Sequence, residues 1–499
     1  MPLRLPSEAS HEPKLPAFPY QLEALRAIEQ LEYAAVFHEP GLGKTKIAID
    51  LALSWFKART VDSVLVVCKR SLVANWATEI RSHSHLFPLV LTQDRKATYV
   101  ALNSPGRLYL THYEVCKTEL ARLKLFLKTR RVAVICDEAQ KLKNPASALF
   151  RTFSQLREGF VRRVILTGTP IANRPYDIWA LIHFLDGGAS LGNDYPRFKE
   201  EFDISPGLAH DPAARARFEA SLSGLFARIQ HFTVRETKRS ARIILPDKIV
   251  ENILVDPEEH QEELYSVYRR ETRAAIEKHG RLSFDDIDEI LKRLLRLVQV
   301  ASNPRLVTDA YNREPGKLPI LRNLLFDAVA QGSKAIVWTS FVDNAKWLGH
   351  QLRDLGSCVV HGHMSIDDRN AALARFKRDT ATRVLVATPG AAKEGLTLTA
   401  ANVAIFFDRS FSLDDYLQAQ DRIHRISQEK TCYIYNLLLR DSVDLWVDDL
   451  LTAKHLAAQL GQADIDPKQY REKATYRFGE ILSSILGSDE TEDRHGQGR

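Results

Sequence analysis

The sequence has few cysteines and no long apolar run. Its five cysteines, which lie far apart with no CxxC pair, are Cys68, Cys116, Cys136, Cys358 and Cys432. This spacing excludes a disulfide-stapled secreted scaffold, a zinc ribbon and a cysteine-ligated iron–sulfur cluster. No stretch approaches the ~18 apolar residues that a membrane helix needs. The N-terminus also lacks the apolar region of a secretory signal. We therefore expect a cytoplasmic protein with no membrane partner.

The composition is that of an ordinary globular chain. Hydrophobic residues make up 45% and charged residues 26% of the 499 positions, and the net charge is +6. Such a mild positive charge is compatible with a polyanionic partner but does not require one. Because single cores stop growing near ~250–300 residues, the length predicts two large units with an insert.

Two series of short apolar runs alternate with helical patterns, which is typical of parallel sheets covered by helices on both faces. The first series predicts strands at 34–37, 63–67, 108–111, 132–136 and 163–167. The second predicts strands at 334–339, 358–361, 383–387, 403–407 and 431–437. Between the two series, residues 257–278 and 286–299 have helical spacing. Asn144 before Pro145 predicts a helix N-cap, and Ser365 predicts another. The fold class is therefore α/β, with two parallel-sheet units and a helical insertion.

A phosphate-binding loop is predicted between the first strand and the helix that follows it. The segment His38–Thr45 carries Gly41, Leu42 and Gly43 before Lys44 and Thr45. Glycines let backbone amides approach phosphate oxygens, and the helix N-terminus favours their charge. Lys44 suits the β/γ-phosphates and the Thr45 hydroxyl suits Mg²⁺. One departure is His38, which stands where the full motif has glycine.

An acidic pair follows the apolar strand 132–136. Because ligands gather at the carboxyl ends of parallel strands, Asp137 and Glu138 should lie beside the phosphate loop. Asp137 suits the Mg²⁺ shell, and Glu138 suits the orientation or deprotonation of the attacking water. Gln140 completes this candidate catalytic group. Thr169, after the strand 163–167, lies in a third strand-end loop.

Two arginines of the second unit are candidates for a γ-phosphate clamp. Residues 416–428 have a helical pattern that would place Gln418, Arg422 and Arg425 on one face. Arginine fingers in NTPases contribute roughly 10³–10⁵ in rate. Because neither unit alone holds both the phosphate-binding loop and the two arginines, we expect a complete site only when the two units close on nucleotide.

These residues together resemble the Snf-type (Swi/Snf-related) ATPases of helicase superfamily two, in a minimal motor form. The matching segments occur in the expected order at 18–21, 64–76, 111–114, 137–140, 166–170, 178–185, 235–248, 336–341, 361–369, 394–399, 418–428 and 441–454. The resemblance implies two RecA-like lobes, ATP and Mg²⁺ as cofactors, and ATP-driven translocation along double-stranded DNA. It further implies that Gln21 recognises adenine. Many relatives have histidine at the position of Gln140.

The resemblance and the patterns together predict four segments. These are an ATP-binding lobe at 1–250, a helical connector at 251–315, a second lobe at 316–460, and a tail at 461–499 that is disordered at its end. We also predict DNA contacts at strand ends, namely Lys69, Arg70, Ser71, Thr111, Thr169, Thr339, Lys393 and Thr397. Contact with the DNA backbone would be salt-dependent and largely independent of base sequence.

The predicted function is a DNA-dependent ATPase that tracks on duplex DNA and remodels or displaces bound protein. One alternative is a helicase that separates DNA or RNA strands, and another is a nucleotide-gated clamp or scaffold that does not hydrolyse ATP. Because the chain outside the motor is short, we expect a protein partner to supply targeting. The missing basic localisation run favours a bacterial or phage-encoded protein. The sequence does not predict the oligomeric state.

Overall fold

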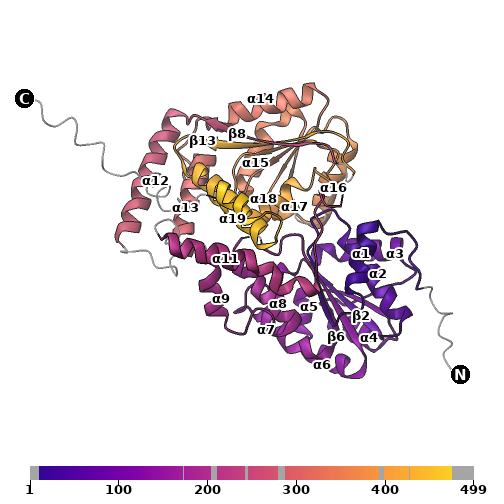
Figure 1. Ribbon diagram of the computed structural model, residues 1–499. Coiled ribbons are helices and arrows are strands. Elements are labelled where there is room, and N and C mark those ends of the chain that lie inside the picture. Colours follow the sequence, from indigo (N-terminus) through magenta and orange to yellow (C-terminus); the bar gives the residue numbers. More distant parts are fainter. Residues whose placement is uncertain are drawn as a thin grey trace, which may run out of the picture. The chain divides into compact units, whose positions relative to one another are not determined.

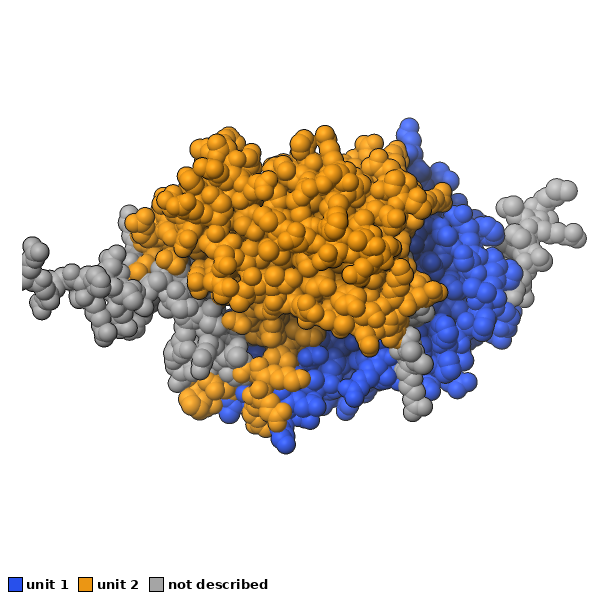
Figure 2. All heavy atoms as spheres, turned by 90° about the horizontal axis from the view of Figure 1, so that it is seen from above, with its two compact units in different colours: residues 1–204, 216–244, 457–470 blue, residues 205–215, 245–456, 471–499 orange. Residues whose placement is uncertain are grey.

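The structure is a computed structural model that describes residues 11–171, 173–203, 211–241, 245–278, 287–392, 398–425 and 427–474, with no side chains at 275–293 and 392 (Figure 1). The chain divides into two compact units, coloured separately in Figure 2. Unit 1 comprises residues 1–204, 216–244 and 457–470, and unit 2 comprises residues 205–215, 245–456 and 471–499.

Unit 1 is built on a sheet whose strand pairs are all parallel. In spatial order the strands are β3 (Leu89–Val90), β4 (Leu108–His112), β2 (Ser63–Cys68), β5 (Val132–Asp137), β6 (Phe160–Leu166), β1 (Tyr33–Val36) and β7 (Thr233–Val234). Parallel strands require crossover connections, which are helical here. The helices are α1 (Pro19–Ile28), α2 (Lys44–Lys57), α3 (Val73–His83), α4 (Arg95–Asn103), α5 (Tyr113–Thr118), α6 (Leu120–Thr129), α7 (Ala148–Leu156), α8 (Ile178–Asp186), α9 (Tyr195–Phe202) and α11 (Pro212–Ile229).

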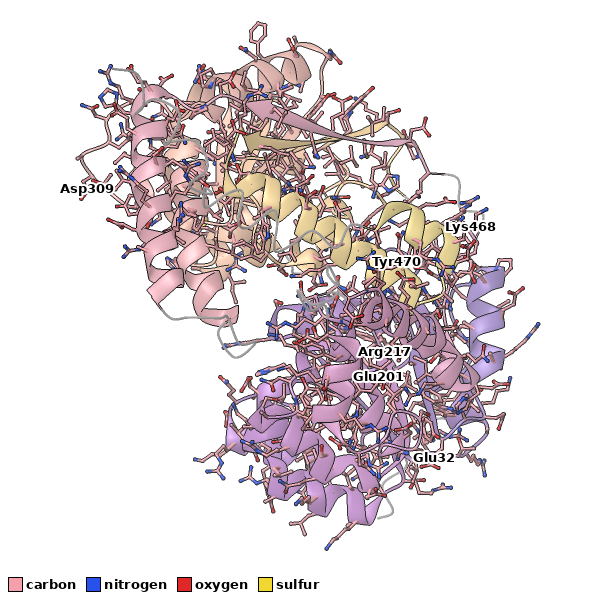
Figure 3. The ribbon with its side chains drawn as sticks, turned by 60° about the vertical axis from the view of Figure 1, so that its left-hand side comes forward. Glu32, Glu201, Arg217, Asp309, Lys468 and Tyr470 are labelled. Atoms are coloured by element: carbon pink, nitrogen blue, oxygen red, sulfur yellow. The ribbon has the colours of Figure 1, made fainter. Side chains whose placement is uncertain are left out.

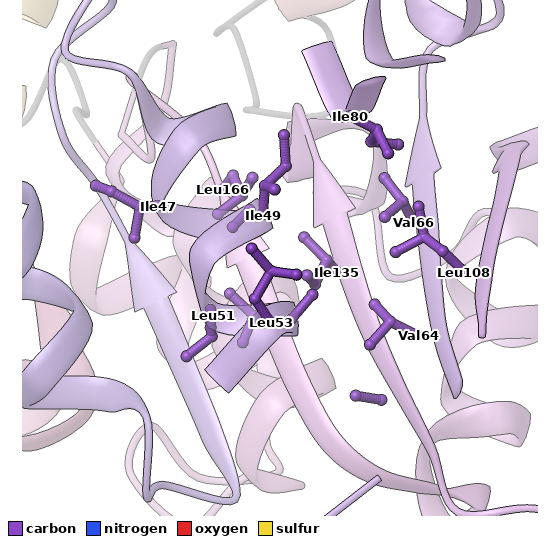
Figure 4. Packing of buried hydrophobic residues seen from close by; sticks show 14 of the residues in the cluster. Ile47, Ile49, Leu51, Leu53, Val64, Val66, Ile80, Leu108, Ile135 and Leu166 are labelled. Carbon is purple, nitrogen blue, oxygen red and sulfur yellow. The ribbon is translucent and has the colours of Figure 1, made fainter. Parts of the chain in front are cut away.

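The core of unit 1 forms where α2 and α3 cover the sheet. Ile49 and Leu53 of α2 and Ile80 of α3 belong to one buried cluster with Val66 of β2 and Ile135 of β5 (Figure 4). Burying a side chain of this size contributes about 1.5–3 kcal/mol. This packing fixes α2, and with it the loop that precedes α2, against the sheet.

Unit 2 contains a second parallel sheet. Its strands in spatial order are β10 (Ser357–Val360), β11 (Val384–Ala387), β9 (Ala335–Trp338), β12 (Val403–Phe406), β13 (Cys432–Leu439) and β8 (Lys248–Val255). Its helices are α12 (Glu259–Lys278), α13 (Ile287–Ser302), α14 (Lys317–Ala330), α15 (Val342–Gln351), α16 (Ile366–Arg378), α17 (Pro389–Ala392), α18 (Leu413–Gln420) and α19 (Val443–Gly461). The two sheets confirm the predicted fold class, α/β with two RecA-like lobes in tandem.

The first predicted segment boundary differs from the division of the structure. Strand β8 pairs with β13 at every position from Lys248 to Val255 and so belongs to the second sheet, whereas the predicted boundary at 250 falls inside it. Most β8 side chains are exposed, so the strand lacks the buried apolar run that marks the other strands.

One predicted helix cap is wrong. Helix α7 is capped by Ser147, while Asn144 accepts a hydrogen bond from the Ala146 amide in a preceding turn. The predicted cap at Ser365 is confirmed.

The C-terminal segment 457–470 belongs to unit 1, although a tail was predicted from 461. Helix α20 (Pro467–Lys473), which carries Lys468 and Tyr470, follows α19 (Figure 3). A Cβ atom on Gly461 would lie 2.8 Å from Leu222 and 2.9 Å from Ile171, so glycine allows this close approach. Asp464 accepts a hydrogen bond of 2.7 Å from Arg235 Nε. The end of the tail, where disorder is predicted, falls within residues 475–499, which lie outside the described residues.

Candidate active site in unit 1

The strand register brings the predicted phosphate loop and the acidic pair to one edge of the sheet. Leu166 of β6 pairs with Val36 of β1 on one side and with Asp137 of β5 on the other. The three strands therefore end at the same level, and the loops that follow them emerge side by side. Thr167–Thr169 lies in the middle of these loops, between the phosphate loop and Asp137. This arrangement is the one expected of a ligand site at the carboxyl edge of a parallel sheet.

The phosphate loop has the backbone that its glycines allow. Gly41 and Gly43 have φ angles of 90° and 72°, in the left-handed region that glycine adopts readily. Helix α2 begins at Lys44, and the Lys44 Nζ atom donates to the carbonyl oxygens of His38 and Glu39 at 2.8 and 3.2 Å. A Cβ atom on Gly168 would lie 2.8 Å from Pro40, so the neighbouring strand-end loop packs directly against the phosphate loop.

Helix α1 holds the phosphate loop from the other side. The Tyr20 hydroxyl and the Gln21 Nε2 atom donate to the Leu42 carbonyl at 3.2 and 3.1 Å. Gln21 also accepts a hydrogen bond of 2.9 Å from the Phe18 amide. Gln21 is thus fixed against the loop on which the nucleotide would lie. Its recognition of adenine stays a prediction.

Asp137 is partly buried at the end of β5. Its Oδ2 atom accepts a hydrogen bond of 2.8 Å from Trp76 Nε1, and its Oδ1 atom accepts one of 2.9 Å from the Glu138 amide. Burial and the neighbouring Glu138 charge raise the pKa of Asp137, while Trp76 and Lys44 act in the opposite direction. The ionised form of such a partly desolvated carboxylate is favoured by a nearby cation.

Glu138 leaves the strand with a left-handed φ of 52°. Gln140 Nε2 donates a hydrogen bond to Glu138 Oε2, and Lys69 Nζ lies 3.5 Å from the same oxygen. The three predicted residues Asp137, Glu138 and Gln140 are therefore together. Lys69 was predicted only as a DNA contact, and its pairing with Glu138 was not foreseen.

His38 is buried beneath the phosphate loop. Burial and the Lys44 charge lower the pKa of His38 to about 4, so its ring is neutral at pH 7. The ring centroid lies 6.2 Å from that of Tyr20. The imidazole of His38 therefore occupies the position where the full motif has glycine. Gly41 and Gly43 nevertheless have left-handed φ angles.

The residues predicted to hold Mg²⁺ fit that ion. Thr45 lies in the first turn of α2, and Asp137 supplies one carboxylate at the neighbouring strand end. Mg²⁺ typically uses one or two carboxylates with phosphates and water. The charge of Mg²⁺ would oppose the rise in the pKa of Asp137 that burial causes. When bound, Mg²⁺ would neutralise charge that develops on the phosphates.

In unit 2 the predicted arginine helix is shorter than expected. Helix α18 ends at Gln420, and the amides of Arg422 and Ile423 bond three residues back instead of four. This tightening ends the α-helix, so Arg422 and Arg425 lie in turns instead of on one helical face with Gln418. Gln418 Nε2 donates to Asp414 at 2.7 Å, and Arg425 Nε donates to the Asp421 carbonyl at 2.8 Å. The γ-phosphate role of both arginines stays a prediction.

The predicted DNA contacts differ widely in exposure. Arg70 is exposed, and Lys69 and Ser71 are partly exposed, just after β2. Thr111 and Thr339 are fully buried, and their hydroxyls donate to the Leu91 carbonyl and to Asp408. Both hydroxyls thus have partners inside the protein, and the contact of these two positions with DNA stays a prediction. Thr169 is also buried. Lys393 and Thr397 lie outside the described residues.

Several residues that bond the strand ends of the two sheets were missed or not given a role. Trp76 in α3 and Tyr113 in α5 bond the Asp137 side chain and carbonyl, the latter at 2.7 Å. In unit 2, Asp408 accepts hydrogen bonds from the Ser302 hydroxyl at 2.7 Å and the Ser340 amide at 2.6 Å. Such long-range pairs leave no local signal in a sequence pattern.

The model of the SNF2-related domain matches residues 20–306, and that of the helicase conserved C-terminal domain matches residues 316–427. The chain belongs to the SNF2-related family. This membership confirms the resemblance and supports ATP hydrolysis as the activity of the chain.

The relatives are larger proteins. An uncharacterized ATP-dependent helicase of Mycoplasma genitalium is 25% identical over 436 residues, which cover 85% of this chain and 40% of that protein. The mouse DNA repair and recombination protein RAD54-like is 26% identical, with 81% of this chain and 60% of that protein covered. The chain thus spans less than two thirds of either relative.

A solved structure, the Sulfolobus solfataricus SWI2/SNF2 ATPase core in complex with dsDNA, is 25% identical with a TM-score of 0.42. The match covers 94% of this chain and 99% of that one.

Within the described ranges, every helix is too short or too polar to cross a lipid bilayer.

Proposed function

We propose that this SNF2-related protein is a DNA-dependent ATPase that translocates on double-stranded DNA and remodels or displaces bound protein. The observation that carries the proposal is the common register of Val36, Leu166 and Asp137. It brings a phosphate loop and two carboxylates together at one sheet edge. The DNA-bound state of the Sulfolobus core and the DNA-repair name of the mouse relative belong to those proteins and motivate the choice of DNA.

In this proposal Lys44 and the loop amides bind the β- and γ-phosphates of ATP. Thr45 and Asp137 hold Mg²⁺, and Glu138 orients the attacking water and accepts its proton. Catalysis of phosphoryl transfer depends mainly on such positioning and electrostatic stabilisation. We keep the proposal that Arg422 and Arg425 supply positive charge to the γ-phosphate. Arg425→Ala should then lose turnover while ATP binding persists.

The proposed partners are duplex DNA, contacted through its phosphates, and a protein that supplies targeting. The relative named TATA-binding protein-associated factor MOT1 of Saccharomyces cerevisiae illustrates a protein partner for a family member. A cytoplasmic location also stays a proposal. Two of the relatives are Mycoplasma proteins, and no finding supports a phage origin.

The experiment compares two substrates with one enzyme preparation. Translocation without strand separation predicts ATP-dependent displacement of a triplex-forming strand and no unwinding of a forked duplex. Lys44→Ala, which lacks the phosphate-binding ammonium, is the negative control. Unwinding of the fork would favour the helicase alternative. If the protein binds ATP without hydrolysing it and shows neither triplex displacement nor fork unwinding, the nucleotide-gated clamp would be favoured.

A further inference from the structure

Lys69 and Glu138 leave the sheet side by side. Val67 of β2 pairs with Cys136 of β5 in the parallel register, and Lys69 and Glu138 each lie two residues further along. Their charged atoms, Lys69 Nζ and Glu138 Oε2, are 3.5 Å apart, and both side chains are largely shielded, with 14% and 26% of their surface exposed. The contact therefore follows from the sheet itself.

The same carboxylate oxygen has a second donor. Gln140 Nε2 also bonds Glu138 Oε2, so two positively polarised groups occupy one oxygen of the group assigned to the attacking water. Glu138 is further constrained by its left-handed φ of 52°, a conformation that non-glycine residues keep only when their surroundings hold it. In this state Glu138 Oε2 is engaged with the protein, which reduces its availability to water.

Lys69 also adjoins other residues that are proposed to contact DNA. It is followed directly by the exposed Arg70 and by Ser71, the other two proposed DNA contacts of this strand end. A DNA phosphate that reaches Lys69 competes with Glu138 for the same ammonium, because a lysine is a compact point charge on a flexible stem. One side chain thus joins the proposed DNA surface to the proposed catalytic carboxylate.

We propose that Lys69 restrains Glu138 in the absence of DNA, and that a DNA phosphate which binds Lys69 releases Glu138 to the attacking water. Lys69 is then a positioning residue that makes ATP hydrolysis depend on DNA. This inference rests on the proposed function and adds to it the residue pair through which DNA acts. Arginine at this position would keep the ion pair, whereas glutamine would abolish it.

The test measures ATP turnover with and without duplex DNA for wild type, Lys69→Gln and Lys69→Arg, together with DNA affinity from anisotropy of a labelled duplex. Lys69→Gln should raise turnover without DNA about five-fold, as expected for loss of a contact near 1 kcal/mol. The ratio of its turnover with saturating DNA to its turnover without DNA should fall by a corresponding factor. Lys69→Arg should keep the low basal rate. Lys57→Gln, which removes a lysine from an exposed pair with Glu12, controls for net charge.

Two results would overturn the inference. One is an unchanged or lower basal rate in Lys69→Gln together with weaker DNA binding, which would make Lys69 a DNA contact alone. The other is a raised basal rate with full DNA stimulation retained. A wild-type enzyme whose turnover ignores DNA would instead contradict the proposed function. The two failures are therefore distinguishable.

Discussion

Replacing Trp76 by phenylalanine should move the acidic limb of the ATPase pH profile to higher pH. The Trp76 indole donates to Asp137 Oδ2 at 2.8 Å, and Trp76 is 1% exposed, so no solvent replaces the lost donor easily. Hydrogen bonds to charged groups contribute roughly 1.5–3 kcal/mol. Since about 1.4 kcal/mol corresponds to one pKa unit, the limb should move by about one to two units.

The sign follows from the ionised form that the hydrogen bond stabilises. Burial already raises the pKa of Asp137, and Trp76 lowers it. Loss of Trp76 raises the pKa further, so a higher pH is needed to ionise the carboxylate that holds Mg²⁺. The effect should weaken at high Mg²⁺ concentration, because the cation competes with the proton for the same carboxylate.

The assay is kcat/KM for ATP as a function of pH at fixed salt and Mg²⁺. Trp55→Phe is a matched control, because Trp55 is equally buried and donates to the Glu29 carbonyl at 2.9 Å, remote from Asp137 in its bonding. Its acidic limb should stay in place. An unchanged or downward-shifted limb in Trp76→Phe, with a folded protein by circular dichroism, would refute the role given to this hydrogen bond.

Three further substitutions have expected outcomes. In Gly43→Ala the added Cβ atom would lie 2.3 Å from Gln21 Nε2, at a residue whose φ angle is left-handed. This change should weaken ATP binding at least ten-fold, as measured by titration. Asp464→Ala removes the partner of Arg235 and should lower the free energy of unfolding by about 1–3 kcal/mol in denaturant titration, whereas Asp464→Asn should lose less. Asp408→Ala leaves several buried donors unmatched and should cost about 3 kcal/mol by the same measurement. An unchanged midpoint would contradict either of the last two.

The parallel strands and the phosphate loop were predictable because they depend on local patterns. The apolar run of β5 and the glycines before Lys44 mark their structures within a few residues. Strand β8 was missed, since its exposed side chains give no such run and its stability comes from pairing with the distant β13. The end of α18 at Gln420 was missed for a related reason. Gln428 Nε2 donates to the Ala401 carbonyl at 2.9 Å, a tertiary contact that periodicity does not show.

Within the candidate site, residue types were predictable and their partners were not. Asp137 and Glu138 were identified by their position after an apolar strand, whereas Trp76 and Lys69 reach them from other elements. The same holds for Thr111 and Thr339, whose hydroxyls donate to the Leu91 carbonyl and to Asp408, partners that the sequence pattern does not reveal.

The central claim is that this protein hydrolyses ATP under the control of duplex DNA, with the phosphate loop and acidic pair of unit 1 in its active site. The most direct test is the rate of ATP turnover with no nucleic acid, single-stranded DNA, duplex DNA and duplex RNA at one salt concentration. The account predicts the highest rate with duplex DNA, loss of that rate in Glu138→Gln, and suppression of the stimulation as salt is raised. Equal turnover in all four conditions would contradict it.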